Sequence, residues 1–172
     1  MAYIKPAKKA KPGGCIFCVK LNVKRSQDRK NLVLWRGQRA FIVMNLYPYT
    51  NGHVMVAPYQ HTGELESLDA ETLQEMMLLV GKSIRALKRV MNPHGFNVGV
   101  NLGRVAGAGV EDHVHMHIVP RWNGDTNFMP ALADVRLIPE LLPQTYDHLR
   151  AALEAETVAP GKRAKRAPAK KS

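Results

Sequence analysis

Three histidines alternate with apolar residues in the segment His113–Val119. A β-strand turns successive side chains to opposite faces, so this spacing predicts a strand with His113, His115 and His117 on one face. The apolar residues between them would then pack into the core, and Pro120 is expected to end the strand because it has no N–H for the ladder. Neutral imidazoles can act as nucleophiles and as metal ligands, so the segment predicts a reactive site rather than an ordinary solvent-facing strand.

A glycine-rich segment, Asn101–Gly109, lies just before the histidines. Glycine allows the backbone to approach a ligand closely, because it has no side chain to clash. Together with the imidazoles, this segment predicts a site that handles phosphate groups.

The only two cysteines, Cys15 and Cys18, have the spacing Cys-x-x-Cys. This spacing is found in thioredoxin-like redox pairs and in half-sites for zinc. A redox pair is expected at a helix start after a buried strand, whereas here the pair follows Pro12-Gly13-Gly14. Tetrahedral zinc needs two more ligands, and His61 with one histidine of the triad strand are the candidates. Inert or redox-active cysteines remain the alternative.

The length of 172 residues indicates one domain with a real hydrophobic core. No run of 18 apolar residues indicates a membrane span, and the N-terminus lacks a secretory signal, so we expect a cytoplasmic protein. The formal net charge of +11 is concentrated at the two ends. Residues 1–14 are predicted to be a disordered basic lead-in, residues 15–156 a nearly neutral folded domain, and residues 157–172 a disordered basic tail.

The basic tail has six Lys and Arg residues and no aromatic residue. It cannot stack on bases, so at most a weak, salt-dependent and non-specific contact with nucleic acid is expected. A solvated tail without a partner is the alternative.

The pattern of apolar residues predicts a helix over residues 69–91, with Ser67 or Asp69 as its N-cap. A short C-terminal helix is expected to begin near Pro139. The predicted strands are 32–35, 40–44, 53–57, 96–101 and 113–119. These elements give an α+β fold with a mainly antiparallel five-stranded sheet, one long helix and a short C-terminal helix. The edges of such a sheet are open to pairing, so a homodimer is expected.

The histidine segment matches the signature His-φ-His-φ-His-φ-φ of the histidine-triad (HIT) family, where φ is apolar. Other segments occur in the order expected for that family: Cys15-x-x-Cys18, Phe41–Asn45, Gly52–Pro58, His61, Asn97…Asn101-Leu-Gly and Pro120-Arg121. Over residues 15–150 the chain therefore resembles the HIT family. The segments Asn101–Gly107 and 120–130 look most like its bacterial branch of diadenosine tetraphosphate-cleaving enzymes.

The resemblance implies nucleotidyl transfer through a covalent intermediate on His115, the middle histidine, which attacks the α-phosphorus. One ring nitrogen of His115 must then be held as N–H by a backbone carbonyl, so that the other is free to attack. His117 is expected to donate to the phosphate oxygens or the leaving group. His53 is expected to orient the catalytic histidine or the strand rather than to bind metal. A non-catalytic protein that only binds or senses nucleotides is the alternative.

The resemblance also implies a structural zinc ion held by Cys15, Cys18, His61 and His113, which would brace the histidine strand rather than activate water. A single metal cluster containing all of the histidines and cysteines is a further alternative.

Several residues match the family's nucleotide contacts. Asn45 is expected at the ribose, Ile42 and Met44 as walls of the base pocket, and Asn101 in the loop near the phosphates. Where many members have polar side chains before the first histidine, this chain has Ala108-Gly109-Val110-Glu111-Asp112.

The backbone N–H groups of Gly107, Ala108 and Gly109 could replace those donors. The altered loop leaves the acceptor open: water gives a hydrolase, phosphate a phosphorylase and another group a transferase. Resemblance in the flanking segments slightly favours phosphate.

Overall fold

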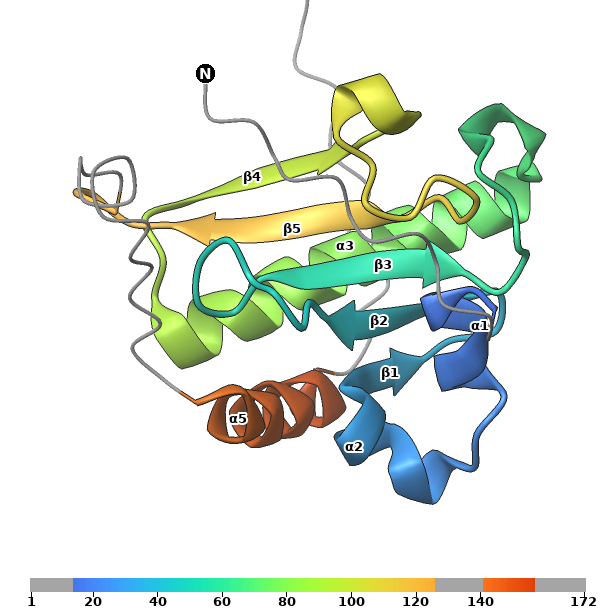
Figure 1. The fold of residues 1–172 in the computed structure, drawn as a ribbon. Coiled ribbons are helices and arrows are strands. Elements are labelled where there is room, and N and C mark those ends of the chain that lie inside the picture. The colour runs from blue at the N-terminus through green and yellow to red at the C-terminus, as the bar shows by residue number, and fades with distance from the viewer. Residues whose placement is uncertain (1–13, 126–140, 157–172) are drawn as a thin grey trace, which may run out of the picture.

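The computed structural model describes residues 14–125 and 141–156, and their centre is a five-stranded antiparallel sheet (Figure 1). The strands lie in the order β1-β2-β3-β5-β4, and each pairs antiparallel with its neighbours. Their bounds are β1 Val33–Arg36, β2 Ala40–Met44, β3 Val54–Pro58, β4 Gly95–Val100 and β5 Met116–Arg121. The predicted α+β fold is confirmed.

Two helices cover one face of the sheet (Figure 1). The long helix α3 spans Ala70–Met91, and the side chain of Asp69 caps it by accepting the N–H of Thr72 at 2.7 Å. The C-terminal helix α5 spans Leu142–Ala155 and packs against α3 and β1. The predicted start of this helix at Pro139 lies outside the described residues. The main apolar core therefore lies between the sheet and these helices.

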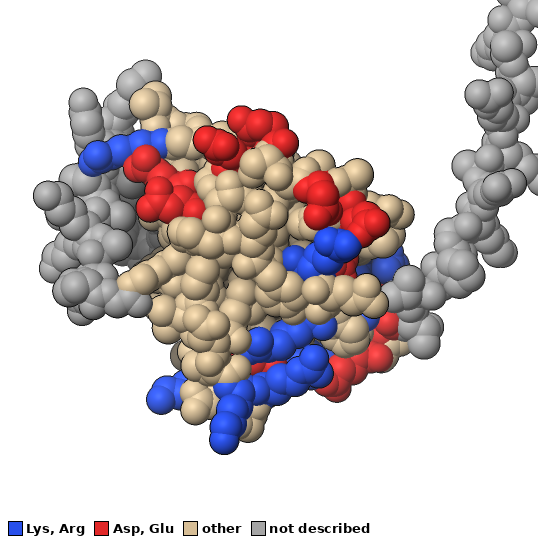
Figure 2. Space-filling view, turned by 90° about the vertical axis from the view of Figure 1, so that its right-hand side faces the viewer, with Lys and Arg blue, Asp and Glu red and all other residues tan. Residues whose placement is uncertain are grey.

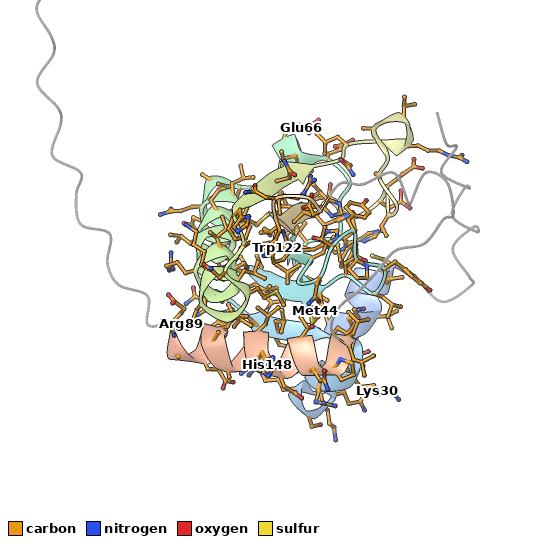
Figure 3. All side chains as sticks on the ribbon, turned by 90° about the vertical axis from the view of Figure 1, so that its left-hand side faces the viewer. Lys30, Met44, Glu66, Arg89, Trp122 and His148 are labelled. Atoms are coloured by element: carbon orange, nitrogen blue, oxygen red, sulfur yellow. The ribbon has the colours of Figure 1, made fainter. Side chains whose placement is uncertain are left out.

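The short helix α1, Ile16–Leu21, covers part of the opposite face, and Figure 3 shows α1 and α3 on different sides of the sheet. Phe17 of α1 packs there in a second apolar cluster with Phe41, Val43, Met55 and other residues. Helix α1 was not predicted, because it has only six residues and shows no full period of apolar spacing. Also not predicted were the short helix α2, Asp28–Asn31, and the 3₁₀ turns Arg25–Gln27, Leu65–Ser67 and Arg104–Ala106.

The histidine strand begins later than predicted, at Met116 rather than at His113. The N–H of Val114 donates to the carbonyl oxygen of Thr62 at 2.7 Å, so this part of the chain bonds to a loop and not to β3. The expected alternation of faces nevertheless holds. Val114 and Ile118 belong to the core beneath α3, whereas His113 and His115 pack on Phe17 at the other face.

Pro120 does not end the strand, as the sequence predicted, but lies inside β5 opposite Phe96. The carbonyl oxygen of Pro120 accepts the hydroxyl of Thr50, on the side away from β4. The proline nitrogen points to that same side, where pairing with β3 has already stopped at Ile118. The missing N–H therefore breaks no ladder bond.

The described surface is not uniformly charged. In the view onto the α1 end of the molecule, Lys and Arg gather along the lower edge and Asp and Glu lie mostly above them (Figure 2). Around α2, the residues Lys24, Arg25, Arg29 and Lys30 are exposed cations. Within the described residues, no helix is long and apolar enough to cross a membrane.

Arg36 of β1 fixes α1 and α2 to the sheet. Its guanidinium pairs with the carboxylate of Asp28 at 2.7 Å and donates to the carbonyl oxygens of Lys20 and Leu21 near the end of α1. Both charged side chains are largely buried, so each is hydrogen-bonded to the protein instead of to water. Arg36 therefore holds in place the helix that carries the cysteines.

We expect Arg36→Ala to lower the free energy of unfolding by about 3 kcal/mol, because the buried Asp28 carboxylate loses its counter-charge. Arg29→Ala is the matched control, since Arg29 forms an exposed pair with Asp147 and such pairs contribute little. Urea unfolding followed by circular dichroism measures both. Equal losses in the two variants would contradict the role assigned to Arg36.

Candidate functional site

One ring nitrogen of His115 is hydrogen-bonded to the backbone, and the other ring nitrogen is not a hydrogen-bond donor. Only 4% of the residue is exposed, and its Nδ1 lies 2.8 Å from the carbonyl oxygen of His113. A carbonyl only accepts, so Nδ1 carries the proton and Nε2 keeps its lone pair. Burial lowers the pKa of His115, against the opposing effect of this hydrogen bond, so the neutral ring is favoured. The structure thus shows the backbone contact expected for a nucleophilic imidazole.

A chain of hydrogen bonds gives His117 the opposite tautomer. The backbone N–H of Tyr49 donates to Nδ1 of His53 at 3.2 Å, so the proton of His53 is on Nε2. That Nε2–H faces Nδ1 of His117 at 2.9 Å, which makes Nδ1 an acceptor. The neutral His117 ring therefore carries its proton on Nε2. His115 thus has an acceptor nitrogen and His117 a donor N–H, and the centroids of the two rings lie 4.8 Å apart.

Both rings of the His53–His117 pair are neutral near pH 7. Burial, followed by the neighbouring His117 and His115 rings, lowers the pKa of His53 to about 3. Burial, followed by His115, lowers the pKa of His117 to about 4. The ring of Tyr49 packs on both of them, with centroid distances of 4.6 Å to His53 and 5.9 Å to His117. Tyr49 was not predicted as a site residue, because no local pattern in the sequence indicates its contact with two histidines.

The second part of the site is a group of four side chains that could hold a metal ion. One ligand atom each from Cys15, Cys18, His61 and His113 lies within 4.8 Å of all the others. Nδ1 of His113 is 3.3 Å from Sγ of Cys15, 3.7 Å from Sγ of Cys18 and 3.3 Å from Nδ1 of His61. The four residues predicted as ligands are therefore brought together.

These separations fit a tetrahedral ion. With ordinary zinc bond lengths, a tetrahedron has edges of about 3.6 Å between sulfur and nitrogen and about 3.3 Å between two nitrogens. Nε2–H of His113 donates to the carbonyl oxygen of Pro58 at 2.9 Å, which leaves Nδ1 free as a ligand. Burial, followed by the adjacent Cys15 thiol, raises the pKa of Cys18, an effect that a cation would reverse. His53 and His117 bond to each other and not to this group.

The predicted base pocket is wrong in two residues. Ile42 and Met44 are 0% and 1% exposed and belong to the core beneath α3, on the face opposite the histidines (Met44 is labelled in Figure 3). The side chains of Phe41 and Val43 are the ones that turn toward the histidine face. A shift of one residue along a strand changes the face, which explains the error.

Asn45, predicted at a ribose, lies directly beside the His53–His117 pair. Its Oδ1 accepts the N–H of Tyr47 at 3.0 Å, and its Nδ2 lies 3.3 Å from Nδ1 of His53. The amide therefore supports the His53 tautomer, because it supplies a second donor to Nδ1. The neighbouring Leu46 is 53% exposed.

The glycine-rich loop uses much of its own hydrogen-bonding capacity. The N–H of Gly107 donates to Arg104 O at 3.0 Å and that of Ala108 to Gly103 O at 3.3 Å. The N–H groups of Gly107, Ala108 and Gly109 were predicted to bind phosphate. The first two of them thus already have partners. The side chain of Asn101 closes the loop through Gly107 O at 3.5 Å. Gly107 has φ +88°, a conformation that favours glycine.

Comparison with known proteins places these features in a family. Residues 26–124 match the family model described as "HIT domain". The chain belongs to the HIT family. The histidine arrangement described above is thus that of a HIT protein, and the match covers β1 to β5.

A Mycobacterium tuberculosis protein named "AP-4-A phosphorylase" is 48% identical over 118 residues, which are 69% of this chain and 60% of the relative. The match thus spans less than two thirds of that protein. A zinc-bound histidine triad protein from Mycobacterium smegmatis superposes with a TM-score of 0.64 at 28% identity, over 83% of this chain and 94% of that one. A "hypothetical histidine triad nucleotide-binding protein" from Sulfolobus tokodaii is 24% identical with a TM-score of 0.65, over 82% of this chain and 93% of that one, and shows the shared fold.

The lowered pKa values of His53 and His117 predict acid sensitivity. In the unfolded chain both rings take up a proton below about pH 6.5, whereas the folded rings resist it. The stabilisation from the two neutral rings is therefore fully present above about pH 6.5. It is lost as the pH falls toward 4, by about 2 kcal/mol per pH unit for the two rings together. Urea unfolding between pH 6 and pH 4 measures the slope.

A double variant, His53→Gln with His117→Gln, is the control, because it retains the four-ligand group and any acid effect on that group. Its stability should fall less steeply with acid than that of the wild type. Parallel slopes would show that the two rings do not cause the acid sensitivity.

Proposed function

We propose that this protein cleaves dinucleoside polyphosphates, such as diadenosine tetraphosphate, through a nucleotidyl-His115 intermediate. The observation that carries the proposal is the pair of opposite tautomers, an unprotonated Nε2 on His115 beside an Nε2–H on His117. The 48% identity to a protein named AP-4-A phosphorylase supports the substrate class. Phosphoryl compounds suit this pair, because their reaction needs a nucleophile and a donor to the phosphate oxygens.

In the proposed first step, the lone pair on Nε2 of His115 forms a bond to the α-phosphorus. The bond between that phosphorus and the bridging oxygen breaks, and the leaving polyphosphate takes the electron pair. Nε2–H of His117 donates to the phosphate oxygens or to the departing oxygen. The positive charge on the His115 ring is stabilised at Nδ1–H by the carbonyl of His113. Asn45 and Asn101 would contact the nucleotide.

In the second step, an acceptor attacks the phosphorus and His115 leaves with the electron pair of the P–N bond. With phosphate as the acceptor, diadenosine tetraphosphate gives ADP and ATP; with water it gives AMP and ATP. We favour phosphate, because the matched relative is named a phosphorylase. Product analysis with and without inorganic phosphate distinguishes the two reactions.

The covalent step predicts an AMP-sized adduct on His115. Wild-type protein mixed with diadenosine tetraphosphate and quenched within one turnover should show this adduct by peptide mass spectrometry. His115→Asn should lack the adduct and lose at least about 1,000-fold in turnover, since the nucleophile itself is removed. It should still bind the nucleotide.

His148→Asn is the matched control, because His148 is exposed on α5 (labelled in Figure 3). It should react like the wild type. Tight nucleotide binding without an adduct or turnover in the wild type would instead support a binding or sensing protein.

We also propose that the four-ligand group holds one structural zinc ion. Cys15, Cys18, His61 and His113 supply two thiolates and two imidazoles, which complete a tetrahedron and leave no position for substrate. The zinc-bound relative from Mycobacterium smegmatis supports the choice of metal. Such an ion would join α1 to the segment that leads into β5.

Elemental analysis should find about one zinc per chain, and Cys15→Ser should lose the metal. Because binding free energy becomes folding free energy, Cys15→Ser should lower the thermal midpoint by more than about 8 °C. Folded Cys15→Ser protein should retain its nucleotide affinity. Equal stability of metal-free and metal-loaded wild type would contradict a structural role, and two or more ions per chain would favour a larger cluster.

The partners we propose are the nucleotide and a second copy of the chain. β4 is an edge of the sheet, and its residue Val98 is 43% exposed, so this edge is available for pairing in a homodimer. Light scattering should give twice the chain mass, and Val98→Lys should shift it toward the monomer. A monomeric wild type would exclude this assembly. The basic tail, residues 157–172, lies outside the described residues, and its weak contact with nucleic acid stays a prediction.

A further inference from the structure

Phe17 connects the two parts of the site. It lies between the two cysteines on α1, and only 1% of it is exposed. Its ring centroid is 5.0 Å from that of His113 and 4.9 Å from that of His115. One aromatic ring therefore touches both a member of the four-ligand group and the proposed nucleophile.

His113 connects the same two parts through its backbone. Its ring belongs to the four-ligand group, while its carbonyl oxygen holds Nδ1–H of His115. That single hydrogen bond fixes one end of the His115 ring, and the free Nε2 has to be held by packing. Phe17 packs against this ring, and it lies between Cys15 and Cys18 in the chain.

We infer that Phe17 is a positioning residue that couples the four-ligand group to His115. Closing the group around its ion fixes the Cys15–Cys18 segment, which presses the Phe17 ring against His115 and holds Nε2 in line for attack. The effect on rate rests on the proposed function, whereas the effect on the His115 ring does not. Small displacements of a nucleophile lower its rate steeply, so the coupling has a measurable consequence.

Phe41 provides a matched control for Phe17. It is fully buried in the same apolar cluster, and its ring packs on Phe17 at 6.3 Å and on Tyr59 at 5.9 Å. No ring contact joins it to His113 or His115 among the described residues. Phe41→Leu and Phe17→Leu thus remove similar volume from one cluster, and only Phe17→Leu removes the contact with His115.

The kinetic test compares the two variants in their metal-loaded form. Phe17→Leu should keep its metal content and its affinity for AMP, yet form the nucleotidyl-histidine about 10-fold more slowly in a single turnover. Phe41→Leu should show a comparable loss of thermal stability with an almost unchanged rate. Equal rates in the two variants would overturn the positioning role.

The second readout needs no turnover. NMR detects the Nδ1–H proton of His115, whose exchange with water should be faster in Phe17→Leu than in the wild type or in Phe41→Leu. If the wild type forms no adduct, the proposed function fails, and this exchange rate still decides whether Phe17 holds the ring. Identical exchange in all three proteins would overturn the inference.

The coupling to the four-ligand group is tested by removing His61, an exposed member that contacts Cys18 and His113. His61→Ala should accelerate the exchange of the His115 proton, and combining it with Phe17→Leu should add little further, because both act through one contact. Should His61→Ala fail to fold, His61→Gln takes its place. Fully additive effects would contradict the coupling.

Discussion

The hydrogen bond from Nδ1–H of His115 to the carbonyl oxygen of His113 is the contact on which the proposed chemistry depends. A free imidazole exchanges its proton between two nitrogens, and only the nitrogen with a lone pair can attack phosphorus. A backbone carbonyl next to the ring removes that ambiguity without adding a charge. The burial of the ring keeps it neutral, so no proton has to leave before it reacts.

The same physical rule gives His117 the reverse arrangement. Its Nδ1 receives a hydrogen bond from His53, whose own tautomer is set by the N–H of Tyr49. Two identical side chains on one face thus acquire opposite roles from their neighbours alone. The sheet supplies the spacing between them, and the loop after β2 supplies the donors. The four-ligand group includes His113, just before β5, so the proposed ion would hold in place the residue whose carbonyl bonds to His115.

Much of this arrangement is visible in the sequence, and the failures have identifiable causes. Alternation of polar and apolar residues predicted which face each histidine occupies, and β2 has the bounds that its apolar run predicted. The predicted start of β5 was wrong because the N–H of Val114 bonds to the carbonyl oxygen of Thr62. This partner lies 52 positions away in the chain, and no local pattern reveals it. Ile42 and Met44 were wrongly predicted to line the base pocket. The resemblance indicated the strand but not which of its alternating residues face the histidines.

The most direct test of the account is the protonation state of each ring nitrogen of His115 and His117. Histidine ¹⁵N NMR of the ligand-free protein at pH 7 distinguishes a protonated from an unprotonated ring nitrogen. We expect a proton on Nδ1 but not on Nε2 of His115, and a proton on Nε2 but not on Nδ1 of His117. The same tautomer on both rings, or a doubly protonated His115, would contradict it.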